Sequence, residues 1–122
     1  MYPDLFVGFD MVSYEDTAPL NTYCEYINPF LKNKHICHPG IVYHAGESFR
    51  RANDNCKVAV DNHSLRIGHG LNLLRDPDTI KKVVQKNILV EANPLSNLLL
   101  GYVNDLNWHP VKFLKEFNVP IR

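Results

Sequence analysis

The sequence lacks an excess of either charge, a long apolar run and any closely spaced pair of cysteines. Its 122 residues include 13 basic and 13 acidic side chains, so the formal net charge is zero. A neutral chain without a basic run gives no reason to expect nucleic acid or an anionic membrane surface as a partner. No apolar stretch approaches the ~20 residues that a membrane-spanning helix needs. The remaining composition is typical of a globular domain.

Cysteine is scarce and widely spaced. The three residues are Cys24, Cys37 and Cys56, and no Cys-x-x-Cys occurs. This spacing argues against a zinc ribbon or a dithiol redox site and favours three ordinary thiols. The first residues, 1–6, carry no basic segment, so no signal peptide is predicted. Asn62 begins a formal N-glycosylation triplet, which matters only in the secretory pathway.

Apolar strands and amphipathic helices alternate along the chain. Strands are predicted over 5–12, 40–43, 65–69, 88–90 and 119–121. Helices are predicted over 20–33, 52–62, 77–86, 96–103 and 111–117. Asp76 is the expected N-cap of the third helix, while Pro29 is expected to kink or split the first. Strands that alternate with helices predict an α/β fold with parallel strands and right-handed crossovers.

Polar, titratable side chains follow the predicted strands at the point where each strand ends. These side chains are Asp10, His44, Glu47, His69, Glu91 and Asn93. The carboxyl ends of parallel strands lie on one face of a sheet, so we expect these groups to converge. The sequence therefore predicts an enzyme site on that face.

The stretch 40–47 is the most informative of these strand ends. Apolar residues run into His44-Ala-Gly-Glu47, which combines an imidazole able to bind a metal with a carboxylate three residues later. The small residues between them allow a ligand to approach the backbone. Taken alone, His44 reads as a strand-capping histidine and Glu47 as a solvated loop glutamate. The other polar strand ends favour the functional interpretation.

Three motifs, in this order, resemble those of the adenosine deaminase family of zinc hydrolases. They are His-Ala-Gly-Glu at 44–47, Arg-Ile-Gly-His-Gly at 66–70 and Glu-Ala-Asn-Pro-Leu-Ser-Asn at 91–97. The segments 8–16 and 105–110 are more similar to the adenosine deaminase-related growth factor branch of that family. The resemblance implies a partial (β/α)8 TIM barrel, comprising about strands 4 to 7 and the start of strand 8, as a single domain over 1–122.

The resemblance also implies roles for the residues at the strand ends. His44 would be one ligand of Zn²⁺, and Glu47 would donate a proton to a purine ring nitrogen. His69 would take the proton of the attacking water or orient that water. Asp10 and Ser13 would contact the purine and shape its pocket, although family members often have glycine where Ser13 stands.

The remaining polar residues are expected to support the site or to lie outside it. Glu91, Asn93 and Ser96 resemble groups that hold a strand end in place around the ligands. The cluster of histidines and cysteine at 35–38 lies at the opposite end of the strand, where barrels carry stability and not chemistry. His63 and His109 are expected to have no convergent partner.

Two motifs of the family have no counterpart in the sequence: the His-x-His pair of the first barrel strand and the Asp-Asp pair of the eighth. We therefore expect a fragment, a partial gene model or a truncated form. The intact parent would deaminate adenosine or deoxyadenosine to inosine, with zinc as cofactor and a small-molecule purine nucleoside as substrate. This chain alone is expected to be inactive or very weak, because one zinc ligand holds the metal poorly.

Two alternatives remain open. The chain could be a non-catalytic remnant or a growth-factor-like binding module, or it could be a relative that acts on adenine or AMP. The zinc deaminases that act on nucleic acid use Cys-x-x-Cys, so that class is disfavoured. A half barrel has open sheet edges, which predict self-association. An extracellular location is expected only if the parent follows the growth factor branch.

Overall fold

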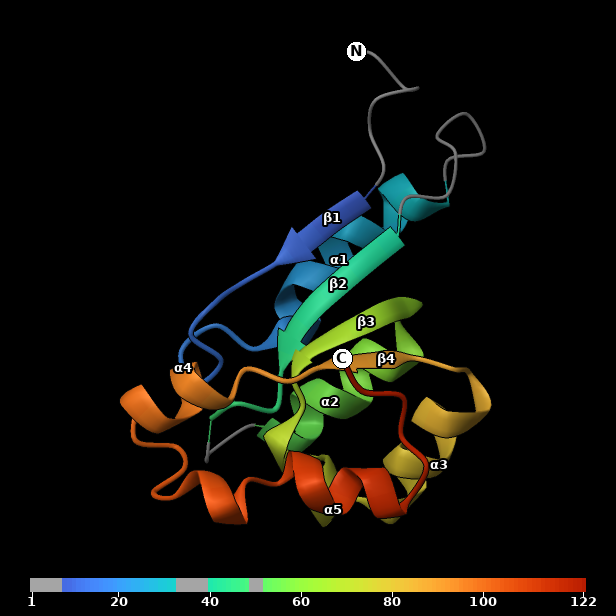
Figure 1. The fold of residues 1–122 in the computed structure, drawn as a ribbon. Helices are drawn as coiled ribbons and strands as arrows, with labels where there is room; N and C mark the ends of the chain where they lie inside the picture. Colours follow the sequence, from blue (N-terminus) through green and yellow to red (C-terminus); the bar gives the residue numbers. More distant parts are fainter. Residues whose placement is uncertain (1–7, 33–39, 49–51) are drawn as a thin grey trace.

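A single parallel sheet forms the centre of the molecule (Figure 1). The computed structural model describes residues 8–32, 40–48 and 52–122. The strands are β1 (Gly8–Met11), β2 (Gly40–Ala45), β3 (Ser64–His69) and β4 (Leu89–Glu91), and each pairs in parallel with the next. Ile121 forms a further parallel bridge with Val90, as predicted for the last apolar stretch. The observed fold is α/β and is consistent with part of a (β/α)8 barrel.

Helices connect the strands and cover one side of the sheet. They are α1 (Leu20–Leu31), α2 (Ala52–Asp61), α3 (Pro77–Gln85), α4 (Pro94–Leu99) and α5 (Val111–Glu116), with short 3-10 turns η2 (Leu71–Arg75) and η3 (Leu106–Trp108). Figure 1 shows α4 near the end of the sheet to which the strand arrows point. In the described part of the chain, no helix combines the length and apolar character needed to cross a membrane.

The start of α3 shows how local sequence defines an element. The Asp76 side chain accepts hydrogen bonds from the backbone N–H groups of Asp78 at 3.2 Å and Thr79 at 3.1 Å. The Thr79 hydroxyl donates to the other oxygen at 2.6 Å, and these bonds hold the pKa of Asp76 below its ordinary value. Pro77 occupies the first turn, where its missing N–H costs nothing. The predicted cap is confirmed.

Two helices differ from the prediction. Helix α4 begins at Pro94 and ends at Leu99, because Gly101 adopts a left-handed φ of 76° that stops the helix. After this turn, the N–H groups of Tyr102 and Val103 both donate to the carbonyl oxygen of Asn97 in the helix. Helix α1 is not split by Pro29, which lies close to the end of the helix. A missing N–H there removes one hydrogen bond near the terminus and leaves the earlier turns intact.

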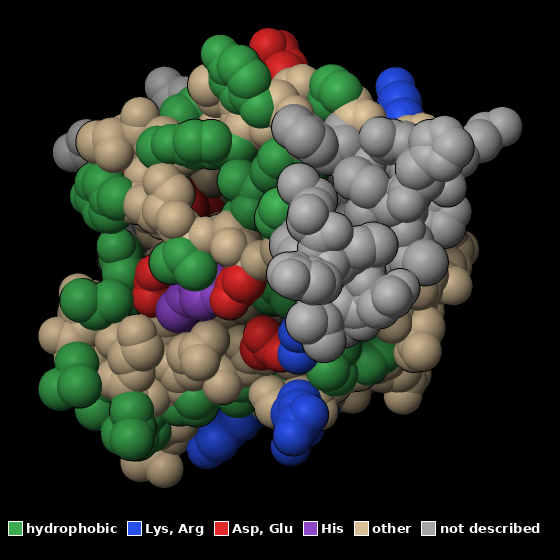
Figure 2. Space-filling model, turned by 90° about the horizontal axis from the view of Figure 1, so that it is seen from above, with side chains coloured by type: hydrophobic (Ala, Val, Ile, Leu, Met, Phe, Trp, Pro, Cys, Tyr) green, Lys and Arg blue, Asp and Glu red, His purple; other side chains and the backbone are tan. Residues whose placement is uncertain are grey.

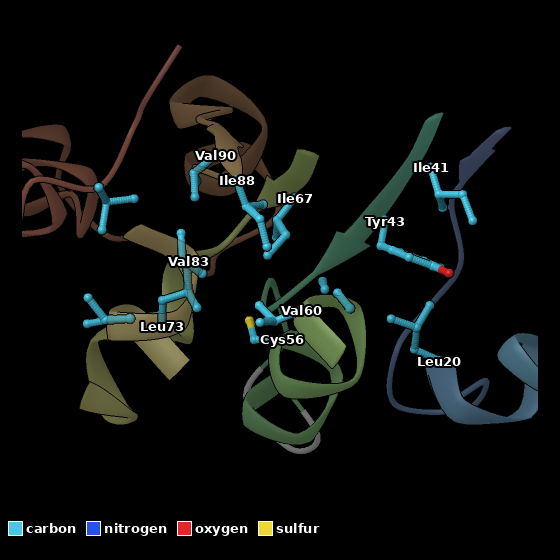
Figure 3. Packing of buried hydrophobic residues seen from close by; sticks show 14 of the residues in the cluster. Leu20, Ile41, Tyr43, Cys56, Val60, Ile67, Leu73, Val83, Ile88 and Val90 are labelled. Atoms are coloured by element: carbon cyan, nitrogen blue, oxygen red, sulfur yellow. The ribbon is translucent and has the colours of Figure 1, made fainter. Parts of the chain in front are cut away.

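The hydrophobic core lies between the sheet and the helices (Figure 3). Ile41 and Tyr43 of β2 and Ile67 of β3 point toward the helices (Figure 3), and all three are nearly inaccessible to solvent. Cys24 and Cys56 are buried free thiols within this core, and burial raises the pKa of both. These two cysteines are therefore ordinary thiols, as predicted. Cys37 and the rest of the cluster at 35–38 lie outside the described residues.

The glycosylation triplet is part of the folded structure at the end of α2. The Asn62 side-chain N–H group donates to the Val58 carbonyl at 2.8 Å, and its oxygen accepts from Asn28 at 3.1 Å. The Ser64 hydroxyl is largely buried and donates to the Arg66 carbonyl at 2.7 Å. The side chains of Asn62 and Ser64 are therefore already hydrogen-bonded within the fold.

Gly46 follows β2 at a position that only glycine fits. Its φ is 81°, and a Cβ atom there would lie 2.4 Å from the Cys56 Sγ atom. We expect Gly46→Ala to lower the free energy of unfolding by about 2 to 3 kcal/mol, as measured by urea denaturation. Gly101→Ala is the matched control: its φ is 76°, but nothing lies within 4 Å of an added Cβ. The control should lose only the stability that alanine costs at a positive φ. Equal losses of unfolding free energy in the two variants would contradict the steric explanation.

Candidate functional site

A hollow of about 300 Å³ opens at the carboxyl ends of the strands. Its lining comes from the ends of the strands and from the segments that follow them: Val12, Ser13, His44, Glu47, His69, Asn93 and Ser96. Figure 2 shows histidine and acidic side chains gathered on one face of the molecule, with hydrophobic side chains around them. The structure thus brings together side chains that the sequence places at four separate strand ends.

His44 lies near the end of β2 and is partly exposed to the hollow. The strand register places it beside Gly68, and a Cβ atom at Gly68 would lie 3.0 Å from the His44 ring carbon Cδ2. Glycine at this position therefore provides the space that the imidazole occupies. The His44 Nε2 atom lies 3.4 Å from the Asp10 Oδ1 atom, on the side where β1 ends.

His69 ends β3 and is buried, with 7% of its surface exposed. Its Nε2 atom lies 3.2 Å from His44 Nδ1, and its Nδ1 atom lies 3.1 Å from Glu47 Oε1. Burial, followed by the nearby His44, lowers the pKa of His69 to about 4. The imidazole is therefore neutral at neutral pH, and its contact with Glu47 is not an ion pair.

The lowered pKa makes stability depend on pH. A histidine with an ordinary pKa of 6.5 when unfolded and about 4 when folded is neutral in both states above pH 6.5. As the pH falls from 6.5 toward 4, the unfolded chain binds the proton first. We therefore expect the free energy of unfolding to decrease by about 2 to 3 kcal/mol over this range, as measured by urea denaturation.

Two substitutions separate this effect from general acid denaturation. His69 and His63 both have a left-handed φ, of 69° and 60°, which asparagine tolerates. His69→Asn should flatten the dependence on pH between 4 and 6.5, whereas His63→Asn, at an exposed position, should not change it. The same slope in all three proteins would contradict the assignment to His69.

Glu47 lies in the loop after β2 with its side chain largely buried. Its Oε1 atom accepts a hydrogen bond from the Asn97 side chain at 3.1 Å. Burial and the negative charge of Glu15 raise the pKa of Glu47, and the bond from Asn97 and the proximity of His44 oppose this in part. A raised pKa favours the carboxylic acid form, which a proton donor requires near neutral pH.

Glu15 is a site residue that the sequence analysis missed. Glu15 is 5% exposed. Its carboxylate accepts hydrogen bonds from the backbone N–H groups of Gly46 at 2.8 Å, Glu47 at 2.7 Å and Ser48 at 3.3 Å. The Asn55 amide donates to the same carboxylate at 2.9 Å. The sequence around Glu15 does not indicate this role, because the partners of the carboxylate lie 31 to 40 residues away. Glu15 fixes the loop that carries Glu47.

Asn72 holds the same loop from the opposite side. Its side-chain N–H group donates to the carbonyl oxygens of Gly46 at 2.9 Å and Ser48 at 2.7 Å. Its backbone N–H also donates to the Gly46 carbonyl at 3.1 Å. The 3-10 turn η2, which the sequence did not predict, places Asn72 here. The backbone around Glu47 is thus hydrogen-bonded on both sides: its N–H groups donate to Glu15, and its C=O groups accept from Asn72.

The prediction that His109 has no partner is wrong. His109 is buried, and its Nε2 atom lies 3.2 Å from Asn97 Oδ1. Asn97 is completely buried, and its Nδ2 atom contacts two residues of the hollow: His69 Nδ1 at 2.9 Å and Glu47 Oε1 at 3.1 Å. The partners come from α4 and from the segment before α5, and no local pattern links these to β2 and β3. His63, by contrast, is exposed.

The other predicted residues lie around the rim of the site. Ser13 and Ser96 line the hollow, as does Asn93, whose amide donates to the Glu91 carbonyl at 3.0 Å. The Glu91 side chain forms an ion pair with Arg66 at 2.7 Å. Their roles toward a substrate stay predictions.

The fit of these residues to zinc is partial. A catalytic zinc site uses three protein ligands and keeps a further position open. Within residues 8–32, 40–48 and 52–122, no group of three or more histidine, cysteine or acidic side chains could hold a metal ion. His44 lines the hollow, and its imidazole fits as a single ligand. The described residues do not form a complete metal centre.

Comparison with known proteins agrees with the three sequence motifs. The family model described as adenosine deaminase matches residues 2–122. The chain belongs to the adenosine deaminase family. Adenosine deaminase 2 of Dictyostelium discoideum is 33% identical over 125 residues, which cover 98% of this chain and 23% of that protein. Human adenosine deaminase 2 is also 33% identical over 125 residues, covering 98% of this chain and 24% of that protein.

Solved structures support the fold of this family member. An adenine deaminase from Arthrobacter aurescens superimposes with a TM-score of 0.79 at 23% identity, over 94% of this chain and 34% of that one. An N6-methyl-AMP deaminase from Arabidopsis thaliana gives a TM-score of 0.74 at 20% identity, over 94% and 32%. These similarities establish the α/β fold as part of a deaminase barrel. The chain spans about a quarter of the length of the curated adenosine deaminases above.

Proposed function

We propose that this chain carries the proton-transfer groups of a hydrolase that deaminates adenosine or deoxyadenosine to inosine. The observation that supports this most strongly is the cluster of His44, Glu47 and His69 around one hollow, with successive contacts of 3.2 and 3.1 Å. The relatives named adenosine deaminase share this segment of sequence.

The geometry suggests a division of labour among these residues. Glu47, with its raised pKa, would donate a proton to a purine ring nitrogen, which makes the adjacent ring carbon more electrophilic. His69 lies beside Glu47 and the hollow, where it can contact the attacking water. His44 would bind zinc, which when bound makes water nucleophilic at neutral pH. Asp10, next to His44, and Ser13, on the hollow, are proposed to contact the nucleoside.

The isolated chain is proposed to have little or no activity. A single imidazole ligand binds zinc much more weakly than the three ligands of a catalytic site. The direct test is to purify the 122-residue chain, add zinc, dialyse, measure bound zinc and follow the loss of adenosine and deoxyadenosine. We expect less than one zinc per chain and at most weak turnover. Stoichiometric zinc with rapid turnover would contradict this part of the proposal.

A chimera tests the roles of the residues themselves. The corresponding segment of Dictyostelium discoideum adenosine deaminase 2 can be replaced by this chain, because the two align over 98% of its length. We expect the chimera to bind zinc and to deaminate adenosine, with release of ammonia. A folded chimera that binds zinc and does not turn over adenosine would contradict the proposed function.

A non-catalytic binding role is the second candidate, and one observation favours it. The described residues do not assemble a metal centre by themselves. An inactive chimera, together with an isolated chain that binds neither zinc nor nucleoside, would support this reading. Self-association through open sheet edges stays a prediction, which sedimentation of the purified chain would test.

A further inference from the structure

A row of buried and partly buried hydrogen bonds leads from the backbone at the start of α5 to His69 and Glu47. Its first member is the backbone N–H of Val111, which can only donate, and it points to His109 Nδ1 at 3.2 Å. His109 Nδ1 is therefore an acceptor without a proton. A neutral imidazole carries one proton, so the proton of His109 lies on Nε2. Burial lowers the pKa of His109, which favours this neutral form.

The proton on His109 determines how the Asn97 side chain is oriented. His109 Nε2–H donates to Asn97 Oδ1 at 3.2 Å, so the amide oxygen faces His109 and the NH₂ group faces the site. The reverse orientation would place NH₂ against the His109 N–H and the amide oxygen against Glu47 Oε1. In the observed orientation, Asn97 Nδ2 reaches both His69 Nδ1 at 2.9 Å and Glu47 Oε1 at 3.1 Å. All buried side-chain polar atoms of the described residues have a partner.

We propose that His109 and Asn97 are positioning residues that set the tautomer of His69. Because Asn97 Nδ2 donates to His69 Nδ1, that nitrogen carries no proton, and the proton of the neutral His69 ring lies on Nε2. His69 Nε2–H points toward His44 and the adjoining hollow.

This arrangement has a chemical consequence, which rests on the proposed function. A His69 ring with its proton on Nε2 presents a donor to the hollow and not a base. It therefore orients the oxygen of the attacking water by donating to it, and it does not take the proton of that water. The lone pair of His69 Nδ1 accepts from Asn97 Nδ2, so the neighbouring Glu47 Oε1, 3.1 Å away, receives no hydrogen bond from the His69 ring.

Nuclear magnetic resonance of the ¹⁵N-labelled full chain tests the tautomer directly. Two-bond correlations between ring nitrogens and ring protons distinguish the two neutral forms of histidine at neutral pH. We expect both His69 and His109 to carry their proton on Nε2. A proton on His69 Nδ1 would overturn the proposal. The measurement needs neither zinc nor turnover, so its result does not depend on whether the proposed deamination is correct.

Matched variants test whether Asn97 is the cause. Asn97→Asp replaces the donor by an acceptor, so we expect the His69 proton to move to Nδ1 in that variant. Asn93→Asp makes the same chemical change at another residue of the hollow and should leave the His69 tautomer unchanged. A folded Asn97→Asp variant that retains the Nε2–H form, or an equal change in both variants, would overturn the proposal.

A third variant covers the case in which Asn97→Asp does not fold. His109→Leu removes the Nε2–H donor and frees the Asn97 amide to rotate. We expect the two His69 tautomers to become mixed in this variant. A single, unchanged Nε2–H form in His109→Leu would show that His109 does not set the tautomer.

Discussion

Glu47→Gln is expected to slow adenosine deamination by about 10²- to 10⁴-fold in the Dictyostelium chimera, the range typical for loss of a general acid. Glutamine keeps the size of the side chain and can still accept the bond from Asn97, but it has no carboxylic proton to transfer. Steady-state kinetics with adenosine would measure the effect, and we expect it mainly in kcat. The unfolding midpoint of the variant shows whether the site is still intact.

Glu25→Gln provides the control for this experiment. Glu25 lies on α1 with its side chain exposed, so the same chemical change there should leave the rate unchanged. If Glu47→Gln retains most of the activity while remaining folded, Glu47 is not the proton donor. If Glu25→Gln loses activity as well, the loss does not report on the site.

Glu15→Leu is expected to lower the free energy of unfolding by about 3 to 5 kcal/mol. The substitution leaves the N–H groups of Gly46, Glu47 and Ser48 and the Asn55 amide without their acceptor in a buried place. Hydrogen bonds to a charged group contribute about 1.5 to 3 kcal/mol each, and their losses are not additive. Urea denaturation of the 122-residue chain, followed by circular dichroism, would measure the change.

Two further variants define the origin of that loss. Glu25→Leu replaces an exposed glutamate on α1 and should change stability by no more than about 0.5 kcal/mol. Glu15→Gln keeps one acceptor oxygen but sets an NH₂ group against donors, so we expect a loss between those of the two leucine variants. If Glu15→Leu is as stable as Glu25→Leu, the carboxylate does not hold the Glu47 loop.

Most elements of the fold were predictable because their signals are local. Asp76 followed by Pro77 predicts a helix start through groups only two and three residues apart, and the structure has those bonds. The limits of α4 were less predictable. Gly101 ends the helix through a backbone conformation that glycine permits without requiring it. The alternation of strands and helices was sufficient to predict a parallel sheet.

The residues of the candidate site also divide into those that local sequence predicts and those that it does not. The side chains of His44, Glu47 and His69 were predictable because each lies at or just after the end of a strand, and strand ends of a parallel sheet meet at one edge. Glu15 and Asn97 were not identified as part of the site machinery. The bond from Asn97 to Glu47 spans 50 residues, and that from Glu47 N–H to Glu15 spans 32. Both residues lie in segments that resemble the family, 8–16 and 91–97, but nothing in those segments indicates which remote side chains they contact.

The sequence by itself determined the order of the elements, the family and the candidate site residues at the strand ends. Periodicity, caps and short motifs are properties of neighbouring residues, so they can be read along the chain. Only the tertiary structure decided how those groups are held: Glu15 on the loop of Glu47, Gly68 beneath the ring of His44, and Asn97 between two reactive side chains. Hydrogen-bond partners and close contacts depend on distances between remote segments, and these are defined only when the sheet and helices pack together.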